Sequence, residues 1–183
     1  MRLFTAIDLP AEIAGRLDTL IGKLRPLAPI GWSRTANLHI TAKFIGQWPE
    51  DRLAQLNRSL AGLASRPPME IRVRSLGFYP NQKSPRVFWA GVEESPALTS
   101  LAEDTDAALE KLGIQRETRT YSPHLTLARI KESSGLSSFL KEVGRLKDPD
   151  FGAFPADRFY LYLSTPGLGG SVYTKLSEFP FTS

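Results

Sequence analysis

Two hydrophobic periodicities alternate along the chain and predict a mixture of strands and helices. From Met69 to Leu76 apolar and charged side chains alternate, which is typical of a strand with one buried face. Elsewhere apolar residues recur three and four positions apart, which indicates amphipathic helices, and three of these segments begin with proline. We therefore expect strands at residues 2–8, 38–45, 69–76, 86–92, 118–130, 159–163 and 172–176, and helices that begin at Pro10, Pro49, Pro96 and Leu136.

Two segments between these elements are rich in turn residues. Residues 79–85 contain two prolines and an asparagine and are expected to form a loop. Residues 166–170, with the sequence Pro-Gly-Leu-Gly-Gly, join the last two predicted strands. They lack the Gly-Lys-Ser/Thr ending of a phosphate-binding loop, so we interpret them as a hairpin loop.

The order of elements in the first half of the chain recurs in the second half. The segment 2–6 resembles the segment 86–90 at an offset of 84 residues, and each predicts a strand followed by a helix that begins with proline. A strand with the pattern His-apolar-Thr follows each helix, beginning at His39 and at His124. This repetition suggests a duplication, with two lobes related by a pseudo-two-fold axis and antiparallel strands in each.

Composition limits the class of protein. The 183 residues suit one compact domain or two small lobes. Cysteine is absent, which excludes disulfides, thiolate metal sites and cysteine nucleophiles. No apolar run approaches the ~18 residues of a membrane helix, and Asp8 precedes any secretory apolar region. We expect a cytoplasmic protein without a membrane segment.

The charge balance suggests an anionic partner. The chain carries 23 basic and 19 acidic residues, a net charge of +4, and 15 of the basic residues are arginine. Arginine presents a planar fork of donors that suits phosphate, so RNA or a nucleotide is a candidate partner. A solvated basic surface is the alternative interpretation.

The two histidines of the chain share one pattern, His39-Ile40-Thr41 and His124-Leu125-Thr126. Side chains two positions apart in a strand lie on the same face, so each histidine projects together with its threonine. The intervening positions, Leu38, Ile40, Ala42, Phe44, Leu125 and Leu127, are then expected to face the core. Two-fold symmetry brings the two His-Thr pairs into one cleft.

This set of side chains suits displacement at phosphorus. One imidazole accepts a proton from the attacking group while a second donates a proton to the leaving oxygen. Threonine hydroxyls donate to the non-bridging phosphate oxygens. A zinc site is less consistent with the sequence, because two histidines without a carboxylate at ligand spacing leave the metal short of ligands. A pair of structural histidines is the other alternative.

The segments Asn37–Gly46 and Tyr121–Arg129 resemble the two motifs of the two-histidine (2H) phosphoesterases, and most closely those of the RNA 2′,3′-cyclic phosphodiesterase or 2′-5′ RNA ligase branch. The resemblance covers nearly the whole chain. It implies one bilobal α+β domain over residues 1–183, with two antiparallel sheets flanking a central cleft and helices on the outside. It also implies hydrolysis of a terminal 2′,3′-cyclic phosphate to a 2′-phosphate without metal or cofactor, and possible ligation in reverse.

In this resemblance the proton donor of the family corresponds to His39 and the proton acceptor to His124. Thr41 and Thr126 correspond to the positions that hold the phosphate. The near-symmetry of the two motifs means that the sequence of this chain does not itself distinguish the acid from the base.

Five further residues are candidates for substrate binding. Lys43 shares the His39 face and is expected either to add charge near the phosphate or to be a solvated lysine at the rim. Arg129 resembles a family arginine, although strict alternation directs it away from His124 unless the strand bulges or ends there. Tyr121, Tyr79 and Trp32 are candidates for base stacking, with packing as the alternative.

Three functions are consistent with the sequence. The first is hydrolysis of cyclic phosphate at RNA ends or in small cyclic nucleotides by a monomeric enzyme. The second is a related 2H enzyme that acts on another cyclic nucleotide or on 2′-5′ linked oligonucleotides. The third is a binding module without turnover, which the presence of both histidines and both threonines disfavours.

Overall fold

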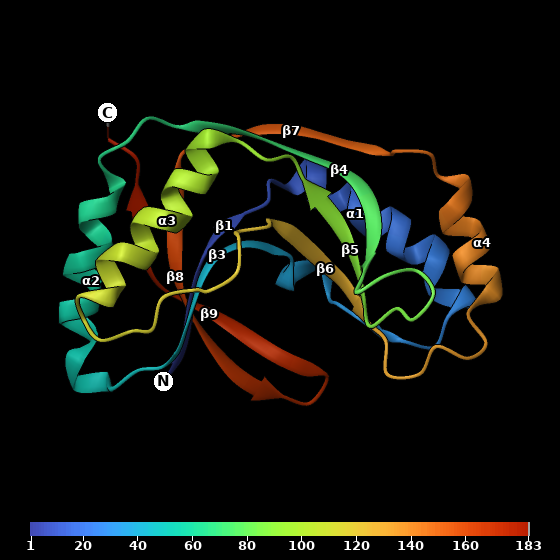
Figure 1. The fold of residues 1–183 in the computed structure, drawn as a ribbon, viewed down its shortest axis with the longest axis horizontal. Coiled ribbons are helices and arrows are strands. Elements are labelled where there is room, and N and C mark those ends of the chain that lie inside the picture. The colour runs from blue at the N-terminus through green and yellow to red at the C-terminus, as the bar shows by residue number, and fades with distance from the viewer. Residues whose placement is uncertain (183) are drawn as a thin grey trace.

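A computed structural model describes residues 1–182, and within them the strands form two antiparallel sheets (Figure 1). The last residue of the predicted domain, Ser183, lies outside the described residues. The first sheet has the order β3-β1-β8-β9, with β3 at His39–Gln47, β1 at Arg2–Asp8, β8 at Arg158–Gly167 and β9 at Gly170–Pro180. The second sheet has the order β2-β6-β5-β4-β7, with β2 at Gly31–Trp32, β6 at His124–Arg129, β5 at Val87–Val92, β4 at Met69–Tyr79 and β7 at Asp150–Ala156.

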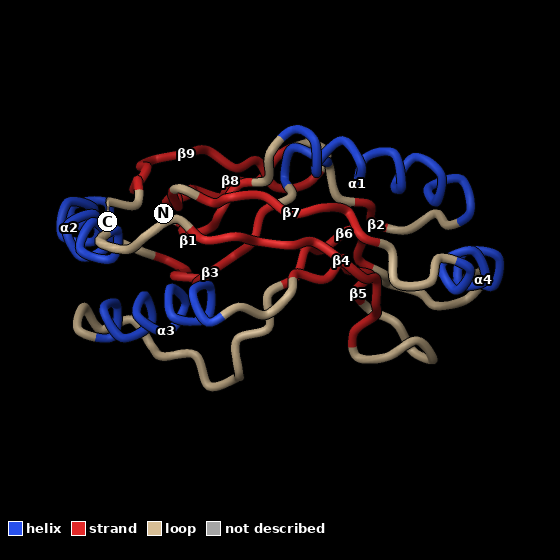
Figure 2. The backbone as a smooth tube through the Cα atoms, turned by 90° about the horizontal axis from the view of Figure 1, so that it is seen from above, coloured by secondary structure: helices blue, strands red, loops and turns tan. Residues whose placement is uncertain are grey.

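Four α-helices of the described chain lie outside the strands (Figure 2), namely α1 (Ala11–Leu24), α2 (Leu53–Ala61), α3 (Pro96–Glu110) and α4 (Ser137–Arg145). Their starts follow from local chemistry. Pro10 precedes α1, and α3 begins where the Ser95 hydroxyl accepts a hydrogen bond from the Leu98 N–H (3.1 Å). None of the helices in residues 1–182 has the length and apolarity to cross a membrane. The expected α+β fold with two antiparallel sheets is confirmed.

The duplication is visible in the topology, because β3-β1-β8-β9 corresponds to β6-β5-β4-β7. The helix that follows the first strand of each half packs on the sheet of the other half. Helix α1 follows β1 but contacts β7, where Arg16 Nη1 donates to the Phe151 carbonyl (2.8 Å). Helix α3 follows β5 and packs mainly against β3, with additional contacts to β4 of the second sheet. One continuous cluster of buried apolar side chains therefore includes residues of both sheets and all four helices.

The sequence alignment of the two repeats was wrong by one residue in their first strands. Asp8 pairs with His39 and Gly91 pairs with His124, so the equivalent positions of β1 and β5 are 83 residues apart rather than 84. Phe4 consequently faces the cleft, whereas Phe88 is fully buried in the core. Alternation does not set the register here, because residues 3–7 of β1 are buried on both faces.

Three strands depart most from the sequence prediction, and one of them, the two-residue strand β2, was not predicted. The strand expected at 118–130 begins only at His124, and residues 115–123 are an irregular segment that ends at Pro123. Strand β7 was missed because it contains Gly152 and Pro155, and such residues are tolerated where a strand lies at a sheet edge. The hairpin interpretation of residues 166–170 is confirmed, since Gly167 pairs with Gly170.

Candidate functional site

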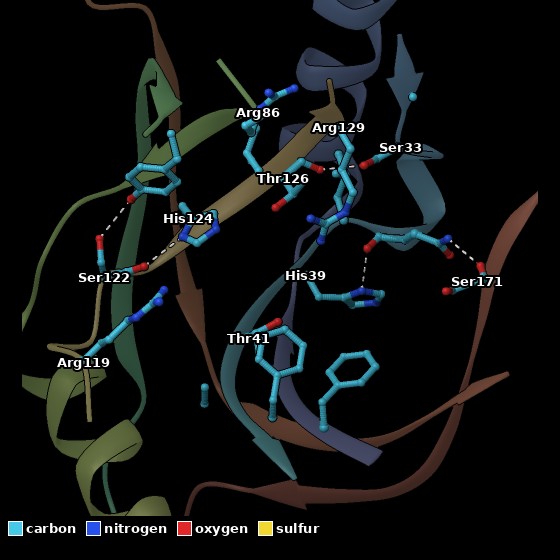
Figure 3. A pocket seen from close by; sticks show the side chains of 18 of the residues that line it. Ser33, His39, Thr41, Arg86, Arg119, Ser122, His124, Thr126, Arg129 and Ser171 are labelled. Atoms are coloured by element: carbon cyan, nitrogen blue, oxygen red, sulfur yellow. Dashed lines mark hydrogen bonds between the residues drawn. The ribbon is translucent and has the colours of Figure 1, made fainter. Parts of the chain in front are cut away.

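A cleft of about 2140 Å³ separates the two sheets and is lined by both His-Thr pairs. Figure 3 shows His39 and Thr41 on β3 across the cleft from His124 and Thr126 on β6. Ile40, Leu125 and Leu127 are buried behind them, as alternation predicts. The structure thus brings together the four residues that the sequence selected. The cleft is larger than the several hundred Å³ of an ordinary small-molecule site.

Both histidines are held by the same backbone contact. Nδ1 of His39 lies 2.8 Å from the Asn37 carbonyl oxygen, and Nδ1 of His124 lies 2.9 Å from the Ser122 carbonyl oxygen. A carbonyl oxygen only accepts hydrogen bonds, so the ring hydrogen of each neutral imidazole is on Nδ1. Nε2 of each neutral ring then carries the lone pair that can accept a proton.

Each motif strand contains a β-bulge directly after its threonine. In β3 the pairing with β1 skips Ala42, and in β6 the pairing with β5 skips Leu127. The extra residue reverses the alternation that follows it. The residue five positions after each histidine, Phe44 in one motif and Arg129 in the other, therefore lines the cleft.

The two bulges determine where the side chains of Arg129 and Phe44 lie, and so test the predictions for both residues. Arg129 shares the cleft with His124 because the strand bulges, so strict alternation was the wrong guide at this position. Phe44 was expected in the core, and this expectation was wrong, because its side chain is 71% exposed. Its ring lies 6.2 Å from that of Phe4, which also lines the cleft. The sequence contains no signal for either bulge.

Lys43 is buried, with 7% of its surface exposed, so the interpretation as a solvated rim lysine was wrong. Its ammonium donates to Asp106 of α3 and to the Gln115 carbonyl (2.9 Å). Burial alone would raise the pKa of Asp106, but Lys43 and the Glu117 N–H hold the pKa below its ordinary value. The Lys43 charge is therefore balanced inside the cleft wall, which leaves it without a free charge to present to phosphate.

Tyr121 links the two motifs. Its hydroxyl donates to the Thr41 carbonyl (2.9 Å), and burial raises the pKa of this hydroxyl. Tyr121 lines the cleft, but its hydroxyl is already hydrogen-bonded to the backbone of β3. Its contact with substrate stays a prediction.

The two other aromatic candidates differ from each other. The indole Nε1 of Trp32 donates to the Ala28 carbonyl (2.9 Å), and its ring packs edge-on against the rings of Phe88 and Phe139, which supports the packing interpretation. Tyr79 lies beside His124, with the two ring centroids 5.2 Å apart.

The surroundings of His39 are more apolar than its motif suggests. The ring of Tyr162 lies 4.5 Å away and that of Tyr173 lies 5.6 Å away. Burial lowers the pKa of His39 below its ordinary value, and the nearby Asp8 carboxylate partly opposes this shift. Asp8 Oδ1 is 3.7 Å from Nε2.

In residues 1–182 no group of three or more histidine, cysteine or carboxylate side chains is arranged to hold a metal ion.

Two successive segments, residues 7–89 and 91–173, match the family described as LigT like Phosphoesterase. This chain belongs to the LigT-like phosphoesterase family. The RNA 2′,3′-cyclic phosphodiesterase of Methanocaldococcus jannaschii is 34% identical, over 97% of this chain and 99% of the relative. The RNA 2′,3′-cyclic phosphodiesterase of Thermus thermophilus is also 34% identical, over 98% of this chain and 89% of the relative.

Solved structures of LigT-like proteins share the fold. The crystal structure of TT0787 of Thermus thermophilus superposes with a TM-score of 0.84 at 32% identity, over 99% of this chain and 98% of the other. The crystal structure of E. coli LigT with 3′-AMP superposes with a TM-score of 0.80 at 28% identity, over 100% and 98%.

The two matches to the LigT-like family divide the chain where the repeat divides it, so each half contributes one His-Thr pair. Sequence reasoning missed two groups of residues: Asp8 and Tyr162, which lie against His39, and three residues that line the cleft, namely Phe44, Arg86 and Arg119. The only signal for Asp8 was a charged residue at the end of a predicted strand, and Phe44 was hidden by its bulge.

Proposed function

We propose that this LigT-like phosphoesterase hydrolyses the 2′,3′-cyclic phosphate at the 3′ end of RNA to a 2′-phosphomonoester, without a metal. The supporting observation is the pair of imidazoles on opposite walls of one cleft, each with Nδ1 bonded to a carbonyl and Nε2 available. The names of the relatives at 34% identity agree with this substrate.

In this mechanism water attacks phosphorus in line with the departing 3′ oxygen. Nε2 of His124 accepts a proton from the water as the new P–O bond forms. The P–O3′ bond breaks, and Nε2 of His39 donates a proton to O3′, which leaves a 2′-phosphate and a 3′ hydroxyl. The hydroxyls of Thr41 and Thr126 donate to the non-bridging oxygens, where negative charge develops. Exchange of protons with solvent then restores both histidines.

The cleft also suits the nucleotides that precede the cyclic end. Arg129 of β6, Arg86 directly before β5 and Arg119 on the irregular segment line the cleft (Figure 3). Phosphate is the natural ligand of such arginines, and single-stranded RNA also binds by stacking its bases on aromatic rings. Phe44, exposed on the cleft face of β3, offers such a ring beside the His39 motif.

A second candidate is turnover of a small cyclic nucleotide or a 2′-5′ linked oligonucleotide. It is favoured by the E. coli LigT structures, which were solved with 3′-AMP, ATP and NADP⁺. Ligation in reverse uses the same atoms, because a 5′ hydroxyl in place of water attacks the cyclic phosphate and forms a 2′-5′ linkage. A monomeric state and a cytoplasmic location stay predictions.

A panel of four substrates in EDTA tests the proposal. It comprises an oligoribonucleotide with a 2′,3′-cyclic end, 2′,3′-cyclic AMP, 3′,5′-cyclic AMP and a 2′-5′ linked oligoadenylate. We expect the highest kcat/KM for the first. A higher value for one of the other three favours the second candidate, and turnover of none of them overturns the proposal in favour of a binding module.

A further inference from the structure

The two histidines face different residues on the neighbouring strand. Asp8 of β1 pairs with His39 in the first sheet. The equivalent position in the second sheet, which pairs with His124, is Gly91 of β5. The two halves of the site are therefore unequal at the residue that stands directly beside each catalytic imidazole.

The Asp8 carboxylate is fixed by two partners besides His39. The Tyr162 hydroxyl donates to Oδ1, and Lys175 Nζ donates to Oδ2 at 2.6 Å. The same Oδ1 lies 3.7 Å from Nε2 of His39. A negative charge is thus held beside the ring nitrogen that exchanges protons with the substrate.

No carboxylate fits at the corresponding place beside His124. A Cβ atom added to Gly91 would lie 2.5 Å from the Arg74 carbonyl oxygen, closer than real Cβ contacts allow. Within residues 1–182, His39 has a carboxylate oxygen within 4 Å of its ring nitrogen and His124 has none.

The geometry points to Asp8 as the positioning residue that commits His39, rather than His124, to the role of proton donor. The inference rests on the proposed function, since it assigns the acid and the base of that reaction. A general acid must carry its proton before the substrate reacts, and a general base must not. A carboxylate beside one imidazole and a glycine beside the other provide this difference.

The charged and titratable groups around His39 come from four strands. Asp8 is on β1, Tyr162 on β8, Tyr173 and Lys175 on β9, and Arg129 enters the same cleft from β6 (Figure 3). Burial lowers the pKa of His39 most, Asp8 raises it, and Lys175 lowers it. Among the side chains around His39, Asp8 is therefore the one that opposes the effect of burial and favours the protonated imidazole.

Proton NMR titration of the Asp8→Asn variant tests the inference directly. The chain has two histidines, so two ring Cε1–H resonances suffice, and H39A and H124A assign them. We expect the pKa of His39 to fall by about one unit in D8N, as for loss of a neighbouring opposite charge. The His124 resonance should titrate as in the wild type, and so should both resonances in the remote control D51N.

Kinetics supply the second readout. Because the protonated fraction of His39 falls only above its pKa, D8N should lose about tenfold in kcat/KM at pH 8 and little at pH 5.5. Equal losses at both pH values, an unmoved His39 titration, or equal shifts of both histidines would overturn the inference. NMR needs no turnover, so failure of the proposed function is seen separately, in the wild-type enzyme.

A second variant keeps the test valid if D8N does not fold. Lys175→Met removes the ammonium that neutralises Asp8, and the Lys175 side chain is half exposed. We expect the His39 titration to shift upward, opposite in sign to D8N. A downward shift or no shift in K175M contradicts the role of Asp8.

Discussion

At the scale of single residues, the two histidines make the same hydrogen bond to the backbone but have different neighbouring side chains. The carbonyls of Asn37 and Ser122 orient both imidazoles in the same way. Tyr162, Tyr173 and Asp8 then surround only His39. The sequence revealed the shared part because it is local, two positions along one strand. The side chains that surround only His39 come from strands distant in the sequence, so no local pattern reveals them.

Replacing either histidine by alanine should abolish proton transfer at one side of the phosphate. We expect kcat to fall by about 10³-fold in H39A and in H124A, within the range for loss of general acid–base catalysis. Folding and phosphate affinity should change little, because both threonines stay in place. Steady-state rates and calorimetric titration with inorganic phosphate measure both effects, and full activity in either variant rules out the two-histidine mechanism.

Arg129 should contribute to binding rather than to proton transfer. Arg129→Gln removes one charged donor from the cleft, and we expect KM for a cyclic-ended RNA to rise about tenfold with a smaller effect on kcat. Arg58→Gln, on the exposed surface of α2, is the matched control and should behave as the wild type. Equal KM values for the two variants would show that Arg129 does not contact substrate.

At the scale of elements, the sequence predicted side-chain orientations correctly before each β-bulge but not after it. The two-residue spacing correctly placed His39 with Thr41 and His124 with Thr126 on the cleft. Beyond each threonine, alternation failed, because a bulge depends on the partner strand and leaves no mark in the sequence of its own strand. The positions of Phe44, Lys43 and Arg129 were therefore beyond local pattern reasoning.

The bulge in β3 also creates the buried ion pair between Lys43 and Asp106. Lys43→Met should lower the free energy of unfolding by about 3 kcal/mol, because it leaves Asp106 charged in the protein interior. Lys141→Met, on the exposed face of α4, is the control and should change stability little. Urea denaturation at pH 7 measures the difference between the two variants.

The same variant has a predicted pH dependence. In the wild type the pKa of Asp106 is lowered in the folded state, so its stabilisation is complete above the ordinary pKa of about 3.9 and is lost as pH falls through the folded value. In K43M the Asp106 carboxylate keeps only the half-exposed Arg116 and the Glu117 N–H as partners, and protonation removes the charge that Lys43 no longer balances. The stability difference should therefore shrink from pH 6 to pH 3, and a constant difference would contradict the ion pair as its cause.

At the scale of the whole molecule, the repeat predicted two lobes but not how they interlock. The first helix of each half packs against a strand of the other sheet, α1 against β7 and α3 against β3. Amphipathic spacing shows that a helix has an apolar face and does not say which sheet covers it. The interlocked halves hold β3 and β6 on opposite walls of one cleft, which is the arrangement that in-line displacement at phosphorus requires.

Hydrolysis of a short RNA with a 2′,3′-cyclic phosphate end, followed by phosphorus NMR in EDTA, tests this account most directly. We predict that the cyclic phosphate signal is replaced by that of a 2′-phosphomonoester. A 3′-phosphate would contradict the position of His39 beside the departing 3′ oxygen. Absence of turnover in EDTA that zinc or magnesium restores would contradict metal-free catalysis by the two histidines.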